Sequence, residues 1–362
     1  MSDAPLTPEY EHGAAVPIHS EVGARRRRAP TTSSPVLSVV VIGRNEGERL
    51  VRCLESVRAM ADPGGPVELI YVDSASTDSS PERAAALGAR VLTVRPERPS
   101  AATGRNVGWR AAQAPFVLFL DGDTILHPRF VADSLPEFQN PKVGVVWGHR
   151  REISTDASLY NRVLDLDWIY PPGITEFCGG DALMRREALV EVDGFDASLI
   201  AGEEPELCQR LRARGYQILH VDRPMTGHDL AMTRWQQYWR RAVRAGHAYA
   251  EVAARFRGTA TPLWEADARR NLIRGGVLLL TLVLGVGGAL LGSAIIPLLV
   301  VGLWLALAVR TALKVGWKSR DPLTRFLYGL HSHVQQIPIL VGQLGYYRDR
   351  WRGRRRGLIE YK

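Results

Sequence analysis

Short apolar segments alternate with stretches of helical spacing through residues 36–147 of this chain. Apolar runs of this length are too short for helices and predict strands buried on both faces. The intervening segments, such as 47–61 and 100–113, carry apolar residues at helical spacing. The predicted strands cover 36–42, 67–72, 89–94, 116–120 and 143–147. This alternation predicts an α/β domain with right-handed crossovers, a mainly parallel sheet and flanking helices.

The longest apolar stretch, residues 277–309, contains no charged residue. As one helix it would be roughly 50 Å long, whereas the hydrocarbon core of a bilayer is about 30 Å thick. Two spans that turn near 287–293 fit better, so we expect a transmembrane helical hairpin over 273–312. Basic residues flank it on both sides, namely Arg269, Arg270, Arg274, Arg310, Lys314 and Lys318. This charge distribution predicts a multi-pass protein of the cell membrane with its α/β domain and both termini in the cytoplasm.

The remaining boundaries follow from composition. Residues 1–35 contain five prolines and an Arg-Arg-Arg-Arg run without apolar periodicity, which predicts a disordered basic tail. The α/β domain would occupy 36–258 and end in an interfacial amphipathic helix near 233–254, followed by a linker over 259–272. Residues 313–362 would form an amphipathic membrane-surface segment and a basic cytoplasmic tail. The polar residues within 322–347 favour a surface or re-entrant segment over a further span.

The net charge of +8 is concentrated in arginine clusters at 25–28 and 348–356. Without a nucleic-acid-binding motif beside them, these clusters favour contact with anionic membrane lipids and no nucleic acid. The cysteines, Cys53, Cys178 and Cys208, are far apart and odd in number. They fit a reducing compartment with neither a disulfide framework nor a zinc site.

Two carboxylates, Asp121 and Asp123, end the apolar run 116–120. Ligands bind open α/β sheets at the carboxyl ends of parallel strands, where Arg44 and Asp73 should also lie. Two carboxylates separated by a flexible glycine can hold a divalent cation together with nucleotide phosphates. An Asp-x-Asp pair alone is a weak signal, because acidic turns commonly follow strands.

Six linked segments carry a resemblance to a known family. In order they are VVVIGRNEGERL, VDSASTD, ATGRNVGWRAA, FLDGDT, FCGGDALMRREALVEVDGFD and GEEPELCQRLRARGY. Over about residues 36–250 the chain resembles inverting family 2 glycosyltransferases of the Rossmann-like GT-A fold. The resemblance implies a nucleotide diphosphate sugar as donor and Mg²⁺ or Mn²⁺ as the metal ion.

The resemblance also implies roles for individual residues. Asp73 would bind the base of the nucleotide, although a helix-capping role is the ordinary alternative. Asp121 would lie near the ribose and the metal, and Asp123 would be the direct metal ligand. The other expected donor contacts are Arg44, Glu46, Arg105 and Asn106.

On the acceptor side the resemblance points to the glycine-rich loop Gly179, Gly180 and Asp181, for which a plain turn is the alternative. The family places its catalytic base in a Glu-Asp pair, but this chain has Glu203 and Glu204. Because a carboxylate remains, Glu204 is the expected base and Glu203 the reserve. Acids at a helix start also have an ordinary explanation in the helix dipole.

Three further residues lie nearer the membrane segments. His228 matches a late histidine that many GT-A enzymes present to the metal, but a single histidine is as often a packed polar residue. Gln237 and Arg240 resemble the Gln-x-x-Arg-Trp motif of processive members, with Arg241 in place of the tryptophan. That departure weakens the case for processivity.

Taken together, the sequence predicts a membrane-bound, metal-dependent glycosyltransferase. The expected acceptor is a hydroxyl of a lipid-linked or membrane-proximal glycan. One alternative is a polyprenyl-phosphate glycosyltransferase, whose acceptor needs no base. Another is an inactive nucleotide-sugar-binding scaffold, which would need neither Asp123 nor Glu204.

Overall fold

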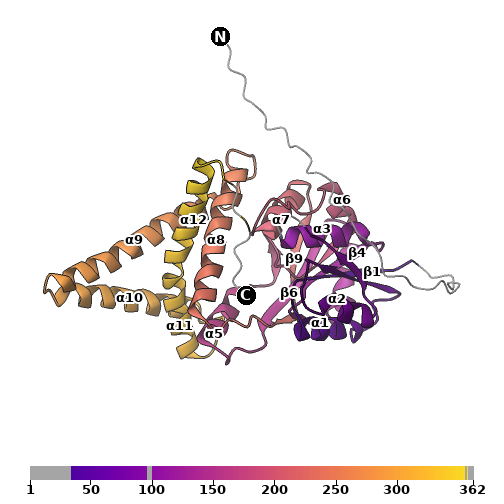
Figure 1. Ribbon diagram of the computed structural model, residues 1–362, viewed down its shortest axis with the longest axis horizontal. Coiled ribbons are helices and arrows are strands. Elements are labelled where there is room, and N and C mark those ends of the chain that lie inside the picture. Colours follow the sequence, from indigo (N-terminus) through magenta and orange to yellow (C-terminus); the bar gives the residue numbers. More distant parts are fainter. Residues whose placement is uncertain (1–33, 96–99, 355–356, 358–362) are drawn as a thin grey trace, which may run out of the picture.

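The computed structural model describes residues 34–95, 100–354 and 357. Most of the predicted N-terminal tail and the end of the basic C-terminal tail lie outside these residues. An α/β domain is followed by a group of long helices, two of which extend away from the domain as a hairpin (Figure 1).

The described strands form one mixed sheet in the order β3-β2-β1-β4-β8-β6-β9-β5, with β7 paired to β9. β1, β2, β3 and β4 are parallel, as predicted. Beyond β4 the sheet is mixed, because β8 runs antiparallel to both β4 and β6. The strands are β1 Leu37–Gly43, β2 Val67–Asp73, β3 Arg90–Thr93, β4 Phe116–Asp121, β5 Thr124–Leu126, β6 Val143–Glu152, β7 Gly173–Thr175, β8 Ala182–Arg185 and β9 Gln217–His228.

The hydrophobic core surrounds the central strands β1 and β4, whose apolar side chains are buried. Helix α1 buries Leu50, Cys53, Leu54 and Val57, the residues at helical spacing in the sequence. The helices of the domain are α1 Glu48–Arg58, α2 Ser80–Ala86, α3 Ala101–Ala111, α4 Phe130–Ser134, α5 Leu159–Asp165, α6 Arg186–Glu191 and α7 Glu203–Ala213, with 3₁₀ turns η1 Leu135–Gln139 and η2 Leu166–Trp168.

The C-terminal part of the described chain consists of long helices. They are α8 Trp235–Phe256, α9 Glu265–Leu290, α10 Ile295–Lys314, α11 Pro322–Val334 and α12 Gln336–Trp351. By length and composition α9 and α10 could each cross a membrane, and only 22% and 6% of their most apolar stretches are buried. Their exposed apolar surfaces therefore indicate association with a membrane. Helix α9 starts at Glu265, so it includes part of the range 259–272 expected to be a linker.

Helix α8 joins the two parts of the molecule. It packs closely against α12, where glycines replace side chains at the contact. A Cβ added at Gly246 would lie 2.0 Å from the carbonyl oxygen of Ile339, and one at Gly342 would lie 2.1 Å from that of Val243. Near α11, the Nζ of Lys318 donates a 2.7 Å hydrogen bond to the carbonyl oxygen of Leu166. The helical part is thereby fixed to the segment that contains η2.

Candidate active site

A cleft of about 800 Å³ lies at the carboxyl ends of β1 and β4. The α/β domain contributes Arg44, Glu46, Asp121 and Asp123 to its walls, and α8 covers it from the C-terminal helical part. The parallel strands thus bring the predicted acidic edge to a cavity large enough for a small-molecule ligand.

Arg105 is at the centre of the charged groups in this cleft. It comes from α3, and only 2% of its side chain is exposed. Its guanidinium forms ion pairs with Asp121 at 3.0 Å, Glu203 at 3.2 Å and Glu204 at 2.9 Å. Because a buried guanidinium needs compensating charge, Arg105 holds three predicted site residues in one cluster.

Two glycines explain how this cluster is assembled. Gly108 lets α3 lie directly on β1, since a Cβ there would come within 2.1 Å of a methyl carbon of Val40. A Cβ at Gly180 would lie 2.6 Å from Nη2 of Arg105, 3.0 Å from Oδ2 of Asp121 and 3.3 Å from Oε1 of Glu204. The loop expected near the acceptor therefore lies against the carboxylates of Asp121 and Glu204 with only its backbone.

Glu204 has the electrostatics of a general base. It lies in the first turn of α7, which starts after Gly202 in a left-handed conformation. Burial raises the pKa of Glu204 to about 7, with a smaller contribution from Glu203, while Arg105 acts in the opposite direction. A carboxylate with a pKa near neutrality can accept a proton far better than an ordinary surface glutamate.

Asp123 and His228 form the part of the site that fits a metal ion. Both are buried, and the Nε2 of His228 lies 3.4 Å from Oδ1 of Asp123. Burial lowers the pKa of His228 well below its usual value, so its imidazole is neutral, as a metal ligand requires. No group of three or more His, Cys, Asp or Glu side chains suited to a metal occurs among the described residues. With two protein donors, a bound cation would take its remaining ligands from phosphate and water.

Asp181 has a supporting position. Its carboxylate accepts a 3.0 Å hydrogen bond from the backbone N–H of Asp121 and a 2.7 Å hydrogen bond from the hydroxyl of Thr226. Burial, above all, raises its pKa. These hydrogen bonds fix the end of β4. They also engage the carboxylate of Asp181, which the sequence suggested as an acceptor contact.

The structure corrects three predicted contacts. Both polar atoms of the Asn106 side chain bond within the domain: Nδ2 donates to the carbonyl of Phe195, and Oδ1 accepts from Trp109 Nε1 and Phe195 N–H. Asn106 therefore fixes a loop instead of contacting the donor. Gln237 caps α8, because its Oε1 accepts the backbone N–H groups of residues 233 and 234. Arg240 is exposed and does not line the cleft.

The face of α8 toward the cleft carries Arg241 and Arg244 instead. The sequence did contain a signal for this face, because positions 241, 244, 245 and 248 follow the helical period.

Asp73 ends β2, where its carboxylate accepts hydrogen bonds from Tyr71 and Ser76. Its neighbour Ser74 lines the cleft.

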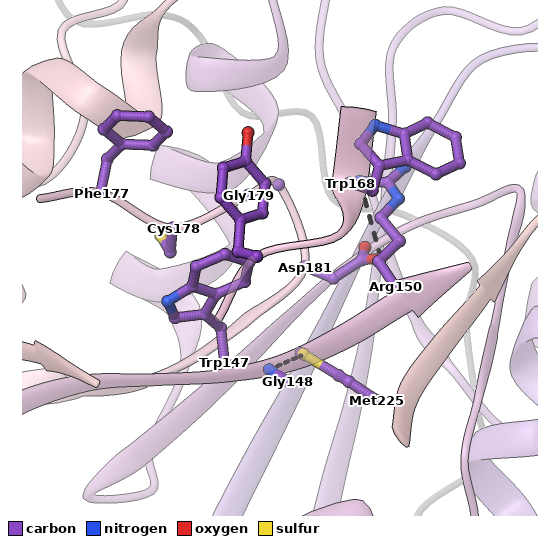
Figure 2. Close-up of a pocket in the computed structure, with 11 residues that line it drawn as sticks. Trp147, Gly148, Arg150, Trp168, Phe177, Cys178, Gly179, Asp181 and Met225 are labelled. Atoms are coloured by element: carbon purple, nitrogen blue, oxygen red, sulfur yellow. Dashed lines mark hydrogen bonds and ion pairs between the residues drawn. The ribbon is translucent and has the colours of Figure 1, made fainter. Parts of the chain in front are cut away.

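Arg150 and Trp168 are site residues that no sequence motif indicated. Arg150 comes from β6, and its guanidinium lies 3.6 Å from Oδ2 of Asp121. It also lies 4.9 Å from the ring centre of Trp168, and Figure 2 shows the two side chains together at one end of a smaller cavity. Trp168 is the last residue of η2, directly after the short helix α5.

The sheet and the cluster at its edge define the GT-A class of nucleotide-sugar glycosyltransferases. The fold matches that of a solved mannosyltransferase, PcManGT from Pyrobaculum calidifontis in complex with GDP-Man and Mn²⁺, with a TM-score of 0.61. That alignment covers 86% of this chain and 88% of the other at 20% identity. The family model for glycosyl transferase family 2 matches residues 38–192, and that for glycosyl transferase family group 2 matches 116–313. The chain belongs to glycosyltransferase family 2.

Curated relatives share parts of this sequence. The pre-mycofactocin glycosyltransferase of Mycobacterium tuberculosis is 26% identical over 76% of this chain and 58% of its own length. Glycosyltransferase AglE of Haloferax volcanii is 22% identical over 52% of this chain and 65% of its own length. The beta-monoglucosyldiacylglycerol synthase of Nostoc is 25% identical over 57% and 48%, respectively. The chain thus spans less than two thirds of the length of each of these relatives.

Proposed function

We propose that this protein is a membrane-bound, inverting glycosyltransferase that transfers a sugar from a nucleotide diphosphate sugar to a hydroxyl of a lipid-linked or membrane-proximal glycan. The observation that carries the proposal is the half-buried Glu204, with a pKa of about 7, beside Arg105 in the cleft. One relative's name refers to a glycolipid product, which agrees with transfer at a membrane.

Glu204 would remove the proton of the acceptor hydroxyl as its oxygen attacks the anomeric carbon. Arg105 holds the carboxylates of Glu204 and Asp121 in fixed positions, so the base is oriented before the acceptor arrives. Attack from the side opposite the departing diphosphate inverts the anomeric configuration. Glu203 pairs with the same guanidinium and keeps its place as the reserve base.

The donor would bind at the other end of the cleft. Asp123 and His228 would hold Mg²⁺ or Mn²⁺, which when bound neutralises charge on the leaving diphosphate. Arg44 and Glu46 line the same end of the cleft, and Asp73 with its loop lies at the neighbouring strand end for the base. The positions of these residues support the donor roles that the sequence led us to expect.

The test uses the full chain in lipid nanodiscs with a panel of nucleotide sugars. Release of nucleotide diphosphate is measured with and without a membrane lipid extract. The proposal requires release that depends on a divalent cation and increases with the extract, together with a large loss in Glu204→Gln and a smaller loss in Glu203→Gln. A wild-type protein that turns over none of the donors would overturn it.

A second candidate is transfer to a polyprenyl phosphate, which Arg241 and Arg244 in the cleft wall would suit. An acceptor phosphate is already ionised and requires no base. Near wild-type transfer by Glu204→Gln onto a polyprenyl phosphate would therefore favour this candidate.

We further propose that α9 and α10 cross the membrane as a hairpin and that α8, α11 and α12 lie at its cytoplasmic surface. The supporting observations are the exposed apolar surfaces of α9 and α10 and the basic residues at both ends of the hairpin. In this arrangement the cleft, which α8 covers, opens close to the membrane surface, where a lipid-linked acceptor would be found.

A further inference from the structure

The short turn η2, which ends at Trp168, is held from outside the α/β domain. Its middle residue, Asp167, contacts α11: the hydroxyl of Tyr328 donates a 3.0 Å hydrogen bond to Oδ1, and Nε2 of His331 lies 3.4 Å from Oδ2. The Nδ1 of His331 lies 2.8 Å from the hydroxyl of Tyr238 in α8, within hydrogen-bond distance. We call Asp167, Tyr238, Tyr328 and His331 the Asp167 cluster. Through it, η2 is connected to two helices of the C-terminal helical part.

Helix α11 is in turn fixed to the hairpin of α9 and α10. A Cβ added at Gly329 would lie 2.2 Å from the carbonyl oxygen of Ala308, so α11 and α10 are in direct backbone contact. One turn later, Nε2 of His333 lies 3.2 Å from the hydroxyl of Thr311 and 3.2 Å from the carbonyl oxygen of Leu307. Because α10 is one of the two helices with exposed apolar surfaces, α11 links η2 to the part of the chain that we propose crosses the membrane.

At its other end, η2 contacts groups of the active site through Trp168. The ring centre of Trp168 lies 4.9 Å from that of His228 and 4.9 Å from the guanidinium of Arg150 (Figure 2), and all three residues line the cleft. The Nε of Arg150 has no hydrogen-bond partner among the described residues, and its terminal nitrogens lie 3.6 and 3.8 Å from the carboxylates of Asp121 and Asp181. These distances exceed those of hydrogen bonds, so the position of Arg150 depends on the ring of Trp168.

The turn η2 is too short to hold its own position. It has three residues and follows α5, which has seven, and elements of this length gain little stability from their own hydrogen bonds. Contacts from later in the chain supply the constraint: Leu327 and Tyr328 pack beside the core around Leu164, and the Asp167 cluster adds polar contacts of defined geometry. The orientation of Trp168 in the cleft therefore follows the position of α11.

We propose that Asp167 is a positioning residue, through which α11 holds the ring of Trp168 in the cleft. The ring in turn supports His228 and Arg150. The inference rests on the proposed function, because the supported groups belong to its active site. It goes beyond that function by making the geometry of the cleft depend on a helix that is fixed to the hairpin. Without the Asp167 cluster the cleft keeps its residues but not their fixed arrangement, so donor binding changes less than the rate of transfer.

The first experiment measures kcat, donor Kd and Tm for Tyr328→Phe and Asp167→Ala, with the full chain in nanodiscs and a membrane lipid extract as acceptor. The donors are UDP-glucose, UDP-N-acetylglucosamine and GDP-mannose. The matched control is Tyr346→Phe, which removes a hydroxyl of α12 that accepts a hydrogen bond from the exposed Arg350. We expect kcat to fall by ~10-fold in both cluster variants, with Kd within ~3-fold of wild type, and no change in the control. Asp167→Asn, which keeps an acceptor for the hydroxyl of Tyr328, should retain more activity than Asp167→Ala.

The second experiment observes Trp168 directly and does not depend on activity. The full chain is labelled with 5-fluorotryptophan, and Trp168→Phe identifies the fluorine NMR resonance of this side chain. In Tyr328→Phe and Asp167→Ala the resonance should shift and broaden, because the ring is no longer held in one orientation. In Tyr346→Phe it should stay at its wild-type position.

A double-mutant cycle tests whether the Asp167 cluster acts through Trp168. Trp168→Ala should lower kcat, and Tyr328→Phe added to it should cause no further loss. Equal losses from Tyr328→Phe with and without Trp168 would overturn the inference, as would wild-type kcat in Asp167→Ala. An unshifted Trp168 resonance in both cluster variants would also overturn it, because the cluster would then contribute only to stability. If the wild type turned over none of the donors, the proposed function would fail, and the resonance of Trp168 would still decide the inference.

Discussion

The most direct test of the site geometry is the substitution Gly180→Ala, which adds a single methyl group. In Gly180→Ala the added Cβ would lie 2.6 Å from Nη2 of Arg105, whereas ordinary contact begins at 3.4 Å. The guanidinium must therefore move by 3.4 − 2.6 = 0.8 Å. It has no free direction in which to move, because it is buried and paired at 2.9 to 3.2 Å with three carboxylates.

A displacement of this size has a predictable cost. Misplacing a catalytic group by about 1 Å can lower a rate by ~10²-fold, and forcing a methyl group into a packed site costs about 1–3 kcal/mol of stability. We therefore expect the kcat of Gly180→Ala to fall by ~10²-fold with a modestly lower Tm. The matched control is Gly179→Ala, where a Cβ meets no atom within 4 Å.

The assay is nucleotide diphosphate release with saturating donor in nanodiscs, with thermal unfolding measured on the same preparations. Gly179 and Gly180 are not among the described glycines with a positive φ, so an alanine at either position causes no backbone strain of that kind. The two variants can therefore be compared directly. Wild-type kcat in Gly180→Ala would refute the reasoning, because the Arg105 cluster would then tolerate displacement. Equal losses in both variants would also refute it, since they would point to the loop backbone and not to the cluster.

Four further outcomes are expected. The transfer rate should increase with pH through about 7 and level off above it, because Glu204 accepts a proton only when deprotonated; Glu204→Gln should lose ~10²- to 10⁴-fold and flatten this dependence of kcat. Asp123→Ala should abolish turnover, and EDTA should do so reversibly until Mg²⁺ or Mn²⁺ is restored; full activity in excess EDTA would contradict the metal assignment. Arg241→Gln should weaken substrate binding, measured by titration calorimetry, whereas the exposed Arg240→Gln should not; equal affinities would contradict the assignment of the cleft-facing side of α8. Reporters fused at Lys362 and near the N-terminus should both read cytoplasmic, and an extracytoplasmic signal at either would contradict the hairpin.

Much of the α/β domain could be predicted from local patterns. Continuous apolar runs identified β1 and β4 as buried strands, and the parallel arrangement of β1 to β4 followed from the alternation with helices. The carboxyl ends of parallel strands share one edge of a sheet, so Asp121 was placed near the ligand site before any coordinates. The antiparallel insertion of β8 was not predictable in this way, because it depends on a long irregular connection.

In the candidate site, too, some features could be predicted from the sequence and others only from the structure. Asp121 and Glu204 were identified from motifs, but their shared ion pairs with Arg105 came from the structure, because Arg105 links residues up to 99 positions apart. The amide of Asn106 was expected at the donor, and only tertiary packing assigned it to Phe195. Position in a motif constrains residue type, whereas the direction of a side chain depends on its neighbours in space.

Helix α8 illustrates most clearly what the sequence alone can and cannot predict. The sequence by itself determined that this segment is a helix, because hydrogen bonds and side-chain spacing within a helix are local. Which face meets the cleft was decided by packing of Gly246 against α12, which turns Arg241 and Arg244 inward and leaves Arg240 in solvent. The smaller aromatic cavity was likewise invisible in sequence, since no periodicity connects Trp147 in β6 with the later segment that contains Tyr170 and Phe177. Local patterns thus determined the elements and the acidic edge, and long-range packing decided which side chains surround the reacting groups.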